Sequence, residues 1–118
     1  DGDLTGVTVS TFTPHSSPLA LFFDRKKDLS KDLRGDGFTI RYSLGARSAL
    51  MKPFTDQGAD LLHLDLSYDK ATDNYFVKTK RIVEGFNGAT DAVMIKNNVF
   101  VIEYGAAGGN IWKISLPK

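Results

Sequence analysis

Few side chains in this sequence have the types and spacing of a known catalytic or metal-binding signature. The chain has two histidines, His15 and His63, and no cysteine, which excludes a thiolate metal site and a disulfide framework. Neither histidine belongs to a Ser-His-Asp spacing. His63 alternates with leucines, so we expect it on the polar outward face of a strand. The Asp1-Gly2-Asp3 stretch has carboxylates spaced as in a calcium loop but lacks the remaining ligands. No metal site is predicted.

Composition excludes two classes of partner. The chain has 118 residues, of which 42% are hydrophobic and 25% charged, with a net charge of +1. These values are ordinary for a soluble globular domain. Basic and aromatic residues are not clustered as a nucleic-acid surface would need, so no nucleic acid is expected as a partner. The longest apolar run, residues 19–23, is far shorter than the roughly 18 residues that a membrane span needs.

Side-chain alternation and turn residues predict an all-β protein. We expect strands at residues 7–12, 19–23, 37–43, 61–67, 75–83, 91–95, 99–104 and 111–116. In the fifth of these, the odd-numbered residues from Tyr75 to Val83, Arg81 included, are expected to share one face. The charged stretch 24–36 has Leu29 and Leu33 four residues apart, which could mark one turn of helix. A solvated loop is the alternative there.

The predicted strands group into two units. Residues 19–83 form a four-stranded meander, and the last three strands form most of a second. Four-stranded meanders are the blades of β-propellers, and a closed propeller needs at least about four blades. The fold class is therefore all-β, with about two four-stranded antiparallel blades of a β-propeller, completed by other blades or chains. Residues 1–118 form a single propeller segment, with 7–83 as the first blade and its preceding strand and 84–118 as the last blade. A β-sandwich is the structural alternative.

Several stretches, in order and spacing, carry a family resemblance over about residues 7–116. Pro14-His15-Ser16-Ser17-Pro18 leads into an apolar strand. Leu33-Arg34-Gly35-Asp36-Gly37-Phe38 begins the next strand, and Tyr42-Ser43-Leu44-Gly45-Ala46-Arg47 follows it. Near the end, Val99-Phe100-Val101 and Ile111-Trp112-Lys113-Ile114 match a phrase common in propellers. In this order the stretches resemble the C-terminal part of the soluble PQQ-dependent glucose and sorbosone dehydrogenases.

The resemblance implies a six-bladed propeller that binds pyrroloquinoline quinone (PQQ), usually with calcium. Such enzymes oxidise a sugar hydroxyl while hydride moves to the quinone and a general base takes the proton. In that family the base lies in an early blade, so no catalytic residue is assigned here. The resemblance also implies a periplasmic or secreted location, a sugar substrate, and partners that supply the remaining blades.

The same resemblance implies a set of cofactor-binding residues. His15 would face the cofactor cavity, where it could donate to a quinone oxygen or a substrate hydroxyl. Arg47 matches the basic residue near the cofactor carboxylates, which a guanidinium binds in bidentate fashion. Asn87 and Thr90 could hydrogen-bond the ligand. The alternatives are a loop histidine bonded to neighbouring serines and a surface arginine.

One departure from the family separates fold from activity. Many members carry an arginine where this chain has Gly88-Ala89-Thr90-Asp91. Small residues cannot replace that charge, which favours a second hypothesis of a different class. In this alternative the chain is a non-catalytic propeller segment that serves ligand binding or assembly.

Overall fold

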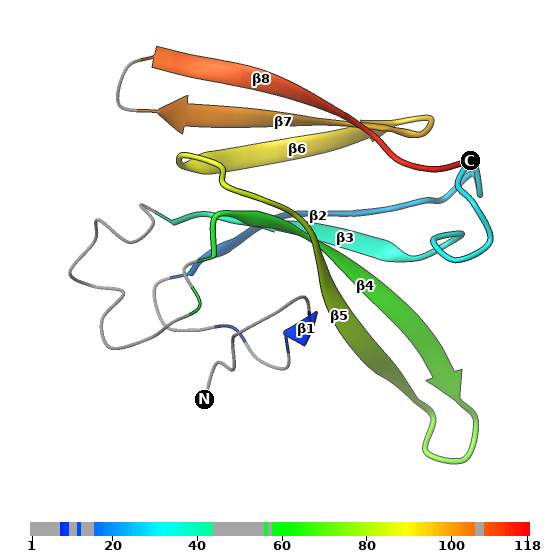
Figure 1. Ribbon diagram of the computed structural model, residues 1–118. Helices are drawn as coiled ribbons and strands as arrows, with labels where there is room; N and C mark the ends of the chain where they lie inside the picture. Colours follow the sequence, from blue (N-terminus) through cyan, green and yellow to red (C-terminus); the bar gives the residue numbers. More distant parts are fainter. Residues whose placement is uncertain (1–7, 10–11, 13–15, 44–55, 57, 106–107) are drawn as a thin grey trace.

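The computed structural model describes residues 8–9, 12, 16–43, 56, 58–105 and 108–118, which form two antiparallel β-sheets (Figure 1). The eight strands are β1 Thr8–Val9, β2 Pro18–Phe23, β3 Gly37–Arg41, β4 Asp60–Asp69, β5 Asn74–Glu84, β6 Ala89–Ile95, β7 Asn98–Gly105 and β8 Gly108–Ser115. The described residues include no helix, and so none able to cross a membrane. The prediction of an all-β protein is confirmed.

The first sheet has the strand order β1-β5-β4-β3-β2. Its longest unit is the β4–β5 hairpin, which pairs from Asp60↔Glu84 to Asp69↔Asn74 and extends away from the rest of the molecule in Figure 1. At its tip the Asp69 carboxylate accepts the Ala71 amide at 2.9 Å and the Thr72 hydroxyl at 2.8 Å. A short acidic side chain that bonds to the following backbone favours a turn.

Two register shifts decide which side chains of the first sheet face the core. In β2 the shift falls between Leu19 and Leu21, where Ala20 has φ 51°. In β5 the shift leaves Ile82 as an extra residue, since Leu61 is opposite Val83 and Leu62 is opposite Arg81. A bulge of this kind turns the following residues to the other face. The expectation that Arg81 and Val83 share a face is therefore wrong.

The second sheet has the order β6-β7-β8. Lys96 and Asn97 form the turn between β6 and β7, and β7 pairs with β8 from Asn98↔Ser115 to Gly105↔Gly108. The first sheet ends at Glu84 and the second begins at Ala89. These are the three strands that alternation predicted for the last part of the chain.

The hydrophobic core lies between the facing sides of the two sheets. The first sheet contributes Phe38, Ile40 and Leu61, and the second contributes Val99 and Val101, all five fully buried. Strand β6 packs against β2 and β3, so the two sheets are closest at β2 and β6 in the centre of Figure 1. Burial of these side chains is the main force that holds the sheets together.

The charged stretch 24–36 is a loop without helix, so the single helical turn suggested by Leu29 and Leu33 is not formed. Its organising group is the buried Asp24 carboxylate, which accepts the amides of Asp28 at 2.9 Å and of Leu29 and Gly35 at 3.3 Å. The loop is not simply solvated, because Leu29 inserts into the core.

His63 is buried, not outward-facing. Its Nε2 lies 2.8 Å from Asp36 Oδ2, and its ring lies 5.4 Å from that of Phe38. The expectation of a polar outward position is wrong because His63 is on the same face of β4 as Leu61, which is the core side.

Candidate functional site

Two of the four predicted cofactor-binding residues, His15 and Arg47, lie outside the described residues. The other two are described. Asn87 lies in the connection from β5 to β6, and Thr90 lies in β6.

The described flanks of these four positions meet at one end of the two sheets. The Tyr42 amide donates to the Ser17 carbonyl at 2.8 Å, which joins the end of β3 to the start of β2. The Tyr104 amide donates to the Gly88 carbonyl at 2.9 Å, which joins β7 to the start of β6. We call this end, marked by Ser17, Tyr42, Gly88 and Tyr104, the loop edge; it lies at the left of Figure 1.

Gly88 brings the two halves of the loop edge into contact. Its φ is +74°, and a Cβ at this position would lie 2.9 Å from the Tyr104 carbonyl oxygen and 3.3 Å from Tyr42 Cε2. A side chain here would therefore have both an unfavourable backbone and no room. Close packing of the chain on itself therefore requires glycine at position 88.

The backbone of Asn87 is held by the buried carboxylate of Glu103. The Asn87 amide donates to Glu103 Oε2 at 2.7 Å, and Asn110 Nδ2 donates to Oε1 at 3.0 Å. These two donors lower the pKa of Glu103, with the Asn110 amide as the larger cause. The loop edge therefore contains a fixed negative charge, which disfavours an anionic ligand beside Asn87.

Thr90 is exposed at the start of β6, and its hydroxyl lies 3.4 Å from the Ile102 carbonyl oxygen. Asn87 thus lies in the β5–β6 connection and Thr90 in the strand that follows it. Among the described residues, no lysine or arginine side chain forms a hydrogen bond with Asn87 or Thr90.

A second polar cluster is buried within the first sheet. Arg41 Nη1 and Nη2 donate to the two Asp56 oxygens at 2.6 and 2.9 Å, while its Nε donates to Asp60 Oδ1 at 2.8 Å. Arg81 donates to the same two carboxylates, at 2.7 Å each. We call these four residues, Arg41, Asp56, Asp60 and Arg81, the buried tetrad.

The charges of the buried tetrad balance. Burial alone would lower the pKa of Arg41, but its hydrogen bonds to Asp60 and Asp56 outweigh burial and raise it. Burial would likewise raise the pKa of Asp56, yet Arg41 and the Gly58 amide lower it. Because the donors and acceptors are directed at one another, the tetrad ties Asp56 to three strands and is not a free anion site.

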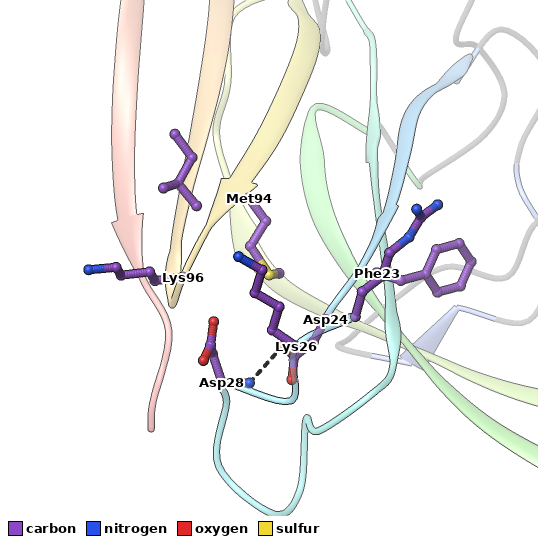
Figure 2. Close-up of a pocket in the computed structure, with 8 residues that line it drawn as sticks. Phe23, Asp24, Lys26, Asp28, Met94 and Lys96 are labelled. Atoms are coloured by element: carbon purple, nitrogen blue, oxygen red, sulfur yellow. Dashed lines mark hydrogen bonds between the residues drawn. The ribbon is translucent and has the colours of Figure 1, made fainter.

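The opposite end of the sheets has a shallow pocket of about 360 Å³ between the 24–36 loop and the β6–β7 turn. Figure 2 shows Lys26, Met94 and Lys96 around it, with the Asp28 amide bonded to Asp24. The Asp24 carboxylate is used by backbone amides, so it organises the loop and offers no coordination site. Among the residues that the structure describes, no group of three or more His, Asp or Glu side chains could hold a metal ion.

The outward side of the first sheet is apolar. A groove of about 530 Å³ runs across it, and Leu21 is 62% exposed beside it. The lining side chains are Phe12, Leu21, Phe23, Leu64, Leu66, Val77 and Thr79. An apolar surface of this extent on a sheet is typical of an interaction site.

The outward side of the second sheet is apolar as well. Its exposed side chains are Val93, Ile95, Ile102, Tyr104 and Ile111. Their register places them opposite the face that bears the buried Val99 and Val101. Tyr104 is 78% and Ile111 71% exposed. Each sheet therefore buries one face against the other and exposes apolar side chains on its outer face. In the first sheet these exposed side chains share the outer face with the buried tetrad, where Phe12 lies 5.3 Å from Arg41.

Sequence reasoning missed the buried tetrad and Glu103. A signal was present, because Arg41 and Glu103 are charged residues inside apolar strand patterns. Charged residues are rarely fully buried unless they are paired. The partners could not be read from the sequence, since Asp56 and Arg81 are distant from Arg41 along the chain and come together with it only in the folded structure.

Comparison of the chain with known protein families, with curated proteins and with solved structures found no match.

Proposed function

We propose that this chain is a two-blade segment of a β-propeller, and that its function is to complete a ring with further blades. The observation that carries the proposal is that both sheets of the two-sheet stack expose large apolar side chains on their outer faces, Leu21 and Val77 on the first sheet and Ile102, Tyr104 and Ile111 on the second. A sandwich of two sheets buries its apolar faces inside and leaves polar ones outside. Blades of a propeller are instead apolar on both faces, because each has a neighbour on either side.

The chain path supports the same proposal. The first sheet is built as β2-β3-β4-β5 and the chain then crosses to β6, which packs against β2 and β3. Strand β6 thus begins a second meander beside the first strand of the first meander. Repetition of this step would place a further sheet on each uncovered face. Heterologous contacts of this kind close into a ring when the rotation between units allows it.

The test is the native mass of the particle that contains the chain. A particle larger than the 13.0 kDa chain, in which hydroxyl-radical labelling of the Leu21 and Tyr104 side chains is suppressed, would support the proposal. A native 13.0 kDa monomer with both faces open to solvent would overturn it.

A second candidate is a segment of a quinoprotein sugar dehydrogenase. The observation that favours it is the loop edge, where the described neighbours of His15 and Arg47 lie beside the Asn87–Thr90 connection. The described residues alone do not fit PQQ, which carries three carboxylates. Arg41 and Arg81 are bonded to Asp56 and Asp60, and Glu103 adds a negative charge at the loop edge. This candidate therefore rests on His15 and Arg47.

The dehydrogenase candidate is tested with the complete native particle, PQQ and calcium. Reduction of an electron-accepting dye by an aldose, lost in an Arg47→Ala variant and kept in the matched surface variant Arg25→Ala, would support it. No dye reduction by the complete particle would eliminate it and leave the assembly role.

A further inference from the structure

The two sheets differ in whether the third strand of the meander is paired on both of its sides. In the first sheet β4 is paired on its outer side with β5 along its whole length, from Asp60↔Glu84 to Asp69↔Asn74. Strand β8 holds the equivalent place in the second sheet, since it is the third strand of a meander that begins at β6. Among the described residues no strand pairs with the outer side of β8, which is the free edge at the top of Figure 1.

The free edge of β8 is unprotected. Proteins usually block edge strands with prolines, charges or bulges. The outer strand of the first sheet follows this rule, because β5 carries Lys78, Lys80 and a bulge at Ile82, and β1 pairs with it at Lys80. Strand β8 is eight residues long, with no proline and with Lys113 as its single charge. It therefore has the properties of a strand that is normally paired.

The chain that follows β8 does not return along this edge. The Leu116 amide donates to the Asn97 carbonyl at 2.8 Å, and the Ser30 amide donates to the Pro117 carbonyl at 3.0 Å. Leu116 is buried in the core. Residues 116–117 are thus fixed to the β6–β7 turn and the 24–36 loop, so a hairpin directly after β8 cannot fill the edge.

A pocket lies where an added strand would place an inward side chain. It measures about 200 Å³ and is lined by Val83, Glu84, Gly85, Phe86, Trp112 and Ile114. Trp112 and Ile114 are on the inward face of β8, opposite Val101 and Val99, and Trp112 remains 50% exposed. A neighbouring strand puts a side chain within about 5 Å of its cross-strand partner, which is close enough to cover Trp112.

We propose that the outer edge of β8 binds an extended strand of a partner polypeptide, antiparallel to β8, with an apolar side chain against Trp112 and the pocket beside it. Backbone hydrogen bonds to the edge would supply affinity and the pocket would supply specificity, as in other cases of strand addition. The expectation of a fourth strand rests on the proposed blade structure, while the free edge, the direction of residues 116–117 and the pocket are independent of it.

The single tryptophan of the chain provides a direct measurement. The probe is a synthetic peptide with the sequence of β5, Asn74–Glu84, which is the strand that covers β4 and contains no tryptophan. Its addition to the full chain is expected to shift Trp112 emission to shorter wavelength, in a saturable way, and to reduce acrylamide quenching. The same peptide with alternate backbone amides methylated keeps its side chains and loses its donors, so its shift is expected to disappear.

Two protein variants locate the binding. Ile111→Lys places a charge in the middle of β8 and is expected to weaken binding of the Lys-rich peptide. Ile95→Lys puts the same charge on the same outer face at β6, away from the edge, and is expected to leave binding unchanged. Equal loss in both variants, an undiminished shift with the methylated peptide, no shift at all, or a Trp112 already shielded in the chain alone would each overturn the inference.

The outcomes separate this inference from the proposed function. Peptide binding at β8 by a chain that is a monomer in its native state would keep the strand site and eliminate the ring of blades. A larger native particle in which Trp112 remains open to quencher would keep the ring and eliminate the strand site.

Discussion

Arg41 and Asp56 form a fully buried bidentate ion pair, with Nη1–Oδ2 and Nη2–Oδ1 distances of 2.6 and 2.9 Å. Asp60 accepts a hydrogen bond from Nε of the same guanidinium, and Arg81 donates to the other Asp60 oxygen. The pair joins β3 to Asp56, the described residue that lies four positions before β4. Two arginines and two aspartates leave the tetrad without net charge, which is what permits its burial.

Removal of Arg41 is expected to be strongly destabilising. Arg41→Ala leaves Asp56 and Asp60 buried with one arginine between them, and breaking a buried pair in this way costs about 3–5 kcal/mol. Urea denaturation followed by circular dichroism measures the loss. The exposed Arg25→Ala, which lies in the 24–36 loop, is the control and is expected to change stability by less than about 0.5 kcal/mol. An Arg41→Ala protein as stable as the control would show that the tetrad does not hold the sheet together.

The buried tetrad also predicts sensitivity to acid. The pKa of Asp56 is lowered in the folded state, so its contribution to stability is present above the unfolded pKa of about 3.9 and is lost as pH falls through the folded value. The urea midpoint should therefore be steady near neutral pH and fall in the acid range. Asp56→Asn has no carboxyl to titrate at this position, and its midpoint should fall less steeply. Parallel curves for the two proteins would assign acid unfolding to other groups.

Glu103 gives an independent prediction of the same sign. Its pKa is lowered by the Asn110 side chain and the Asn87 amide. In Glu103→Gln one carboxylate oxygen is replaced by an amide nitrogen, which donates and does not accept. One of the two N–H donors therefore loses its acceptor, and an unsatisfied buried group costs about 1–3 kcal/mol. The variant should be less stable than the native chain at neutral pH. The difference should shrink in acid, as Glu103 becomes protonated in the native chain. A difference that stays constant with pH would contradict this account.

Strand positions could be predicted from the sequence because alternation and turn residues act locally. The face on which each side chain lies could not be predicted beyond the bulges at Ala20 and Ile82. A bulge inverts the alternation of faces, and the sequence contains no signal of its position. Val83 consequently lies on the core side of β5, and Arg81 lies on the other side, within the buried tetrad. Contacts between distant positions could not be predicted. Asp56 and Arg41 are 15 residues apart, and Asp56 lies outside the strands, so no alternation pattern indicates their contact.

The same limit applies to the predicted ligand site. The sequence indicated Asn87 and Thr90 as residues that hydrogen-bond a ligand; Asn87 lies in the β5–β6 connection and Thr90 in β6. The sequence could not indicate that a buried Glu103 would bond the Asn87 backbone. Nor could it show that Gly88 is required by the approach of Tyr104 and Tyr42. Both depend on the packing of β7 and β3 beside this connection.

The β6–β7 turn offers a test of backbone strain. Lys96 has φ 56°, a left-handed conformation that asparagine adopts more readily than lysine. Lys96→Asn is therefore expected to stabilise the chain by up to about 1 kcal/mol, measured by thermal denaturation. Lys70, in the β4–β5 turn, is exposed and is not among the described residues with positive φ. Lys70→Asn is the matched control and should leave the melting temperature unchanged. A gain in both variants would point to lost charge, not relieved strain.

The last prediction concerns the two uncovered sheet faces. Leu21 and Tyr104 are 62% and 78% exposed, on the outer faces of the first and second sheets. Leu21→Lys and Tyr104→Lys should barely change the stability of the isolated chain, because neither side chain contributes to the core. In the native particle each lysine would be buried against a neighbouring blade, so each variant should shift light-scattering mass toward the free chain.

Phe76→Lys is the control, since Phe76 is also exposed, at 60%, but lies near the tip of the β4–β5 hairpin. If all three variants assemble as the native chain does, the exposed faces are not blade contacts. Disassembly caused by Tyr104→Lys alone would indicate a single neighbouring blade, packed on the outer face of the second sheet.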